Sequence, residues 1–106
     1  MLVIRAHKRF AVCSPARLRG RGKRGERGLL IELSLEGGRL SNLPAQAFTL
    51  DQQVTLRIDG AEPLEARIRW LSDGIAGLRF LRPLQAQTLD RLVRLCRESE
   101  RGVAAA

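Results

Sequence analysis

The sequence predicts a single, mostly β domain that ends in one helix. Short segments of alternating apolar and polar residues, separated by Gly and Pro, cover most of the 106 residues, a pattern typical of antiparallel strands joined by tight turns. After Pro83 the apolar period changes from two to about 3.6, which indicates a helix. A chain of this length has room for one domain, and we find no internal repeat.

Residues 10–18 and 29–34 are the first two expected strands. Alternation in the second places one set of side chains toward a core: Leu29, Ile31 and Leu33. Glu32 and Ser34 then project together from the opposite face. After the Gly37-Gly38 pair, which permits a tight turn or a bulge, residues 39–41 continue as a short strand.

The connection between the first two strands is strongly basic. Its Lys and Arg residues alternate with glycines: Arg17, Arg19, Arg21, Lys23, Arg24 and Arg27. This composition predicts a flexible hairpin connection over residues 17–28. It can attract nucleic-acid phosphates without sequence selectivity, but a solvated loop is the simpler interpretation and nucleic acid is the less favoured partner.

Three more strands and the helix follow. Residues 54–58 alternate and end at the Asp59-Gly60 turn pair, while residues 64–70 place Ala66, Ile68 and Trp70 on one side. The Asp73-Gly74 turn then leads into residues 75–81, which completes a hairpin. The helix is expected over residues 83–100, framed by Pro83 and Gly102. Its apolar stripe consists of Leu89, Leu92, Val93 and Cys96.

Charge and residue usage limit the possible functions. The net charge is +8, and residues 1–39 hold ten of the nineteen Lys and Arg but only three of the eleven acids, so this half should attract anions. No segment has the length or apolarity of a membrane span or a signal peptide. Cys13 and Cys96 are expected as free thiols, and His7 is the only histidine, so no metal site is predicted. Catalysis is not expected, because no Ser/His/Asp set or carboxylate pair is present.

Two polar motifs, followed by two strand motifs, carry a family resemblance. The polar motifs are Arg5-x3-Arg9 and Glu32-x-Ser34-x2-Gly37; the strand motifs are Ile68-x-Trp70 and Gly77-x2-Phe80. In order and spacing this set resembles the PilZ domain, which binds the bacterial second messenger cyclic di-GMP. The resemblance implies a six-stranded antiparallel β-barrel followed by a helix. By this resemblance the domain covers residues 1–102 and consists of a ligand-binding segment (1–9), a barrel (10–82) and the helix. Residues 103–106 would form a flexible tail.

The resemblance also implies roles for individual residues. Arg5 and Arg9 would bind phosphate or guanine through their guanidinium groups, and Glu32 would accept hydrogen bonds from the guanine edge. Ser34 would contact phosphate or base, although its hydroxyl can equally satisfy a local turn. Gly37 would allow close backbone approach or a positive φ. Further candidates are Lys8, Gly38 and Arg79.

Glu32 departs from the Asp or Asn that the family usually has at this position. It keeps the carboxylate charge but places it one methylene farther from the backbone. Trp70 is expected to pack in the core or at its rim rather than serve as a platform for a base.

These inferences predict a bacterial, cytoplasmic cyclic di-GMP receptor with no catalytic activity and no cofactor. It would signal to an unidentified effector protein through ordering of residues 1–9, in trans or by a change of oligomeric state. Two alternatives remain open: a protein-interaction adaptor that has lost nucleotide binding, and a small basic barrel that binds nucleic acid non-specifically.

Overall fold

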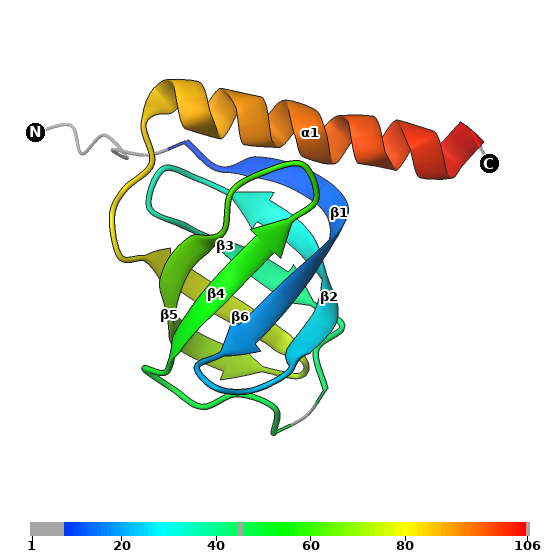
Figure 1. Cartoon of the computed structure of the whole chain (residues 1–106). Helices are drawn as coiled ribbons and strands as arrows, with labels where there is room; N and C mark the ends of the chain where they lie inside the picture. Colours follow the sequence, from blue (N-terminus) through cyan, green and yellow to red (C-terminus); the bar gives the residue numbers. More distant parts are fainter. Residues whose placement is uncertain (1–7, 45, 106) are drawn as a thin grey trace, which may run out of the picture.

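Six strands close into an antiparallel barrel, and one helix lies across one end of it (Figure 1). The computed structural model describes residues 8–44 and 46–105, with side chains through residue 99. The elements are β1 (Phe10–Gly20), β2 (Gly25–Leu33), β3 (Gly37–Ser41), β4 (Gln53–Ile58), β5 (Leu64–Ser72), β6 (Ile75–Phe80) and α1 (Ala86–Ala105). The strand order is β1-β2-β3-β6-β5-β4, and β4 pairs back onto β1. The predicted six-stranded antiparallel barrel with a C-terminal helix is confirmed.

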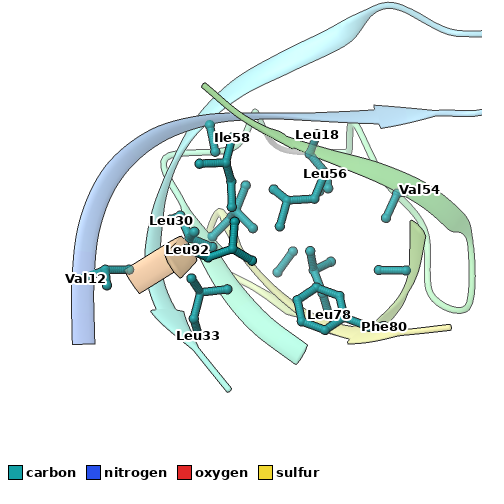
Figure 2. Close-up of a cluster of buried hydrophobic side chains, with 14 of the residues drawn as sticks. Val12, Leu18, Leu30, Leu33, Val54, Leu56, Ile58, Leu78, Phe80 and Leu92 are labelled. Atoms are coloured by element: carbon teal, nitrogen blue, oxygen red, sulfur yellow. The ribbon is translucent and has the colours of Figure 1, made fainter. Parts of the chain in front are cut away.

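Aliphatic side chains fill the barrel interior. Along β1 every second residue is buried, as expected of a strand with one core face. Figure 2 shows Leu18, Leu56 and Phe80, from three different strands, directed into the same interior. Because the barrel is closed, each of the six described strands pairs with a neighbour on both sides over at least part of its length.

Helix α1 covers one end of this core (Figure 1). Its predicted apolar stripe is buried: Leu89, Leu92, Val93 and Cys96. Leu92 lies close to Leu30 and Leu33 of the barrel (Figure 2). The β3–β4 connection lies at the other end of the barrel and contributes buried Leu43 and Phe48. Hydrophobic contacts therefore hold the helix against the barrel.

The helix boundaries differ from the predicted range of 83–100. The residues after Pro83 first pair with another part of the chain, since the Leu84 N–H donates to the Leu35 carbonyl over 2.7 Å. The helix therefore begins at Ala86. It extends to Ala105, so the expected tail is helical through residue 105. Gly102 costs a helix only about 1 kcal/mol relative to Ala, and the alanines beyond it favour the helix. Within the described residues no helix is long and apolar enough to cross a membrane.

The basic segment over residues 17–28 is mostly regular sheet, not the flexible connection that its composition predicted. β1 and β2 pair as far as Arg19 and Gly25, which leaves only residues 21–24 as a turn. The Lys23 N–H donates to the Gly20 carbonyl at 3.1 Å, and Gly22 adopts a φ of 71°. Backbone pairing within the barrel overrides the weak strand preference of the glycines.

Two register shifts change which side chains face the core. The shift between Leu30 and Glu32 buries Leu30 together with Leu33. The predicted inward position is therefore confirmed for Leu33 and wrong for Leu29 and Ile31, which are only partly buried. The shift between Ile68 and Trp70 leaves Trp70 40% exposed rather than inward beside Ile68. One extra residue in a strand moves all following side chains to the opposite face.

Burial predicts where the barrel resists substitution. Leu56 is fully buried, whereas Leu50 is 64% exposed. We expect Leu56→Ala to lower the free energy of unfolding by about 2–5 kcal/mol, because it removes buried methyl groups and leaves a cavity. Leu50→Ala should change it by less than about 0.5 kcal/mol. Urea denaturation measures both, and equal losses would contradict this assignment of the core.

Candidate functional site

A hollow of about 460 Å³ lies on the outer side of the barrel, where β2, β3, β6 and β5 are consecutive neighbours. Six of the predicted site residues line it: Arg9, Glu32, Ser34, Gly37, Gly38 and Arg79. They come from the residue before β1, from β2 and the turn after it, and from β3 and β6. Lys8 is not in the lining, and its Nζ lies 5.3 Å from the ring centroid of Phe10. Arg5 lies outside the described residues.

The hydroxyl of Ser34 holds the turn between β2 and β3. Its Oγ accepts hydrogen bonds from the backbone N–H groups of Glu36 at 3.3 Å and Gly37 at 3.2 Å. The Ser34 N–H donates to the Gly37 carbonyl at 2.9 Å, which closes the turn. Ser34 therefore has the local turn role that its sequence context allowed, and its contact with a ligand stays a prediction.

Gly37 and Gly38 are required by close backbone contacts. A Cβ at Gly37 would overlap the carbonyl oxygen of Leu78 on β6, and one at Gly38 would lie 2.8 Å from the Glu32 carbonyl oxygen. Neither glycine is among the described residues with positive φ. Of the two roles expected for Gly37, the structure therefore supports close approach.

Glu32 and Arg39, which both line the hollow, form an ion pair. They are register partners on β2 and β3, and the Arg39 Nη2 donates to the Glu32 Oε1 at 3.2 Å. The Glu32 side chain is only 18% exposed, against 42% for Arg39. The Arg39 Nε is buried and has no hydrogen-bond partner, the one such side-chain atom among the described residues. An unsatisfied donor at this position favours an acceptor on a bound ligand.

The indole of Trp70 lies over Gly77. The two residues are register partners on β5 and β6, and a Cβ at Gly77 would overlap the indole ring. Because Gly77 has no side chain, Trp70 lies against the outer face of the sheet and lines the hollow. The structure thus places Trp70 on the outer face of the barrel, not in the core or at its rim as expected.

The charged groups around the hollow suit an anion. Four arginines line it (Arg9, Arg39, Arg69 and Arg79), against two acids, Glu32 and Glu36. Guanidinium groups bind phosphate through paired N–H donors, and the indole offers a flat apolar surface. The lining includes no His, Cys or Lys. The hollow is therefore equipped to bind an anion that carries planar rings.

Sequence reasoning missed three side chains of this site. Arg39 follows from register, because a turn at residues 34–37 places it opposite Glu32. Arg69 and Trp70 required knowledge of the register shift in β5, since simple alternation does not place these two neighbours on the same hollow.

Comparisons with known proteins agree with this fold. A family model described as PilZ domain matches residues 4–98. The chain is similar to the PilZ domain of CeSA from a cellulose synthesizing bacterium, with a TM-score of 0.64 and 22% identity over 88% of this chain and 98% of that one. It is also similar to the Bacillus subtilis inhibitor of motility (MotI/DgrA), with a TM-score of 0.60 and 15% identity over 95% of this chain. That alignment spans 53% of the motility inhibitor, about half its length. No curated protein matches the chain.

The glycine contacts yield a stability prediction. Gly37→Ala forces a methyl group against the Leu78 backbone, so we expect a loss of about 1–3 kcal/mol in the free energy of unfolding. Gly25→Ala is the matched control, since its nearest neighbour would be the Arg19 Cβ at an ordinary 3.8 Å. Thermal denaturation should show an unchanged or slightly higher Tm for Gly25→Ala. A Gly37→Ala protein as stable as the wild type would contradict the close contact.

Proposed function

The chain belongs to the PilZ family, and from this premise we propose that its outer hollow binds cyclic di-GMP. PilZ domains are generally cyclic di-GMP receptors and adaptors rather than enzymes. The main support for the proposal is that Arg9 and the Glu32-x-Ser34-x2-Gly37 motif, which are distant in sequence, line the same hollow.

Arginines supply the phosphate contacts in this proposal. Cyclic di-GMP carries two phosphodiester anions, and Arg9 lies at the hollow in the segment just before β1. Arg5, four residues earlier, would bind from the same segment. Arg39 and Arg79 would contribute from the barrel, and a ligand oxygen would satisfy the buried Arg39 Nε.

Glu32 and Trp70 would recognise the guanine bases. The Glu32 carboxylate accepts hydrogen bonds from the N1–H and N2–H groups of guanine once its Oε1 is shared with, or released by, Arg39. The indole of Trp70, in the lining of the hollow, offers a stacking surface. In this proposal Ser34 and Gly37 act mainly by holding the turn that positions Glu32 and Arg39.

Ligand binding would be transmitted by residues 1–9. Arg5 and Arg9 fold onto the dinucleotide, and the ordered segment changes the surface that a protein effector meets. The receptor would act on this effector in the bacterial cytoplasm, directly or through a change of oligomeric state. The similarity in fold to an inhibitor of motility supports an output through another protein.

One observation favours a second candidate function. Glu32 is engaged by Arg39 within the protein itself, so a guanine edge must compete for it. A domain in which this pair persists would be a protein-interaction adaptor without nucleotide binding.

Calorimetric titration with cyclic di-GMP tests the proposal. We expect binding at micromolar concentration or tighter at physiological salt, with GTP and cyclic di-AMP as ligand controls. Arg9→Ala should weaken binding at least about tenfold, because it removes a charged hydrogen bond. The control Arg82→Ala removes an exposed arginine outside the hollow and should leave Kd unchanged. No binding by the folded wild-type protein would favour the adaptor.

Hydrogen exchange tests the proposed signal. Backbone amides in residues 1–9 should exchange at least several-fold more slowly with cyclic di-GMP bound, because the segment becomes ordered over the ligand. Amides of the β1–β2 turn, residues 21–24, serve as the internal control and should not change. Equal exchange of residues 1–9 with and without bound ligand would contradict the switch.

A further inference from the structure

A second basic surface lies on another part of the barrel. Arg17 on β1 is the register partner of Arg27 on β2 and also of Arg57 on β4. All three side chains are exposed, so they form a row across three neighbouring strands. Arg19 stands two residues further along β1 on the same face. We call these four residues, Arg17, Arg19, Arg27 and Arg57, the arginine face.

The arginine face is not neutralised by the protein itself. Among the described residues, none of its four side chains makes a hydrogen bond or an ion pair. The nearby acid Glu65 is engaged by Thr55 at 2.7 Å and Gln53 at 3.4 Å. Asp59 lines one edge of the surface without pairing to an arginine. Like charges directly opposite each other destabilise a sheet, so the row is costly unless an anion occupies it.

The surface is hollowed rather than flat. A concavity of about 570 Å³ is lined by all four arginines together with Gly25. Gly25 lies opposite Arg19, and a Cβ there would contact the Cβ atoms of both Arg19 and Arg17. The missing side chain keeps the space between the arginine stems open. Guanidinium groups can therefore approach a bound phosphate from two sides.

The spacing of these arginines and the basic composition around them favour a ligand that is a polymer of phosphates. Neighbouring strands lie about 4.8 Å apart, so the row from Arg27 through Arg17 to Arg57 spans about 10 Å. Long arginine side chains at the two ends can reach phosphates on both walls of a duplex groove, which is about 12 Å wide in the major groove. The β1–β2 turn extends the positive charge with Arg21, Lys23 and Arg24.

The absence of apolar anchors on this surface distinguishes between classes of partner. The exposed large hydrophobic residues of the described chain are Leu50, Trp70, Leu71 and Leu81, and none lines the concavity. Protein interfaces depend on buried aromatic or aliphatic anchors, whereas nucleic-acid interfaces are polar and strongly positive. No aromatic ring lines the concavity either, so single strands lack the stacking platforms on which they depend.

We propose that the arginine face binds the phosphate backbone of a nucleic-acid duplex without reading its base sequence. This binding site is separate from the outer hollow, because the two linings share no residue. The interaction is electrostatic and moderate in strength, with Kd between about 10⁻⁴ and 10⁻⁶ M at physiological salt.

Fluorescence anisotropy with a labelled 20-base-pair DNA duplex of arbitrary sequence tests the proposal. Four phosphate contacts predict a slope of log K against log salt between about −3 and −4, hence a roughly 100-fold loss of affinity from 50 to 200 mM salt. Arg17→Gln combined with Arg57→Gln should reduce the slope to about −2 and the loss to about tenfold. Duplexes of different sequence should bind with equal Kd.

Matched control variants distinguish binding by the arginine face from a general effect of the protein's positive charge. Arg82→Gln combined with Arg91→Gln removes the same charge at exposed positions outside the concavity and should keep the wild-type slope. Arg9→Ala should also keep it. The Arg17/Arg57 variant should retain or raise the wild-type Tm, because it relieves repulsion between like charges.

Four outcomes would overturn the proposal. The first is no binding of the duplex at 50 mM salt. The second and third are a reduced salt slope in Arg9→Ala, or one in the Arg82/Arg91 control as large as in the Arg17/Arg57 variant. The fourth is displacement of the duplex by polyglutamate or anionic phospholipid vesicles at equal charge concentration. The last would assign the arginine face to an acidic protein or a membrane surface.

Discussion

The close approach of β3 to β6 at Gly37 is the constraint on which both the barrel and its outer hollow depend. β3 has only five residues, yet it pairs with β2 on one side and β6 on the other. At Gly37 the backbone comes so close to the Leu78 carbonyl that no side chain fits. A wider separation would open the barrel between these strands. It would also move Arg39 on β3 away from Arg79 on β6, and so take apart the hollow that both residues line.

Sequence periodicity predicted which elements exist more reliably than which way their side chains face. Alternation and turn residues predicted the strands because closed-barrel strands have one buried face. Alternation predicted the wrong side-chain direction at Leu30 and Trp70, because a register shift reverses the faces there and no local sequence signal marks such a shift. The helix start was misplaced for a similar reason, since Leu84 pairs with the distant Leu35. The polar motifs predicted four of the twelve residues that line the hollow: Arg9, Glu32, Ser34 and Gly37. Arg39 could be recognised only from its pairing across the turn.

Arginine side chains occur in two different arrangements on this barrel. In the outer hollow it is mixed with Glu32, Glu36 and an indole, which suits a small anion with polar ring edges. On the arginine face it stands in an unpaired row, which suits an extended polymer of phosphates. The ion pair of Glu32 with Arg39 gives the hollow a further property. In the proposed receptor, a ligand must compete with an internal partner for the acid that recognises guanine, so release remains easy once ligand concentration falls.

Trp70 offers the most direct test of the central claim, because it is the only tryptophan in the chain and it lines the hollow. The measurement is a ¹H–¹⁵N NMR titration with cyclic di-GMP that follows the indole N–H signal and the backbone amides. A bound dinucleotide should shift the indole signal saturably, together with the amides of Arg39 and Gly77, and leave those of Arg17 and Arg57 in place. An unchanged indole signal at saturating ligand, or shifts confined to Arg17 and Arg57, would contradict binding in the hollow.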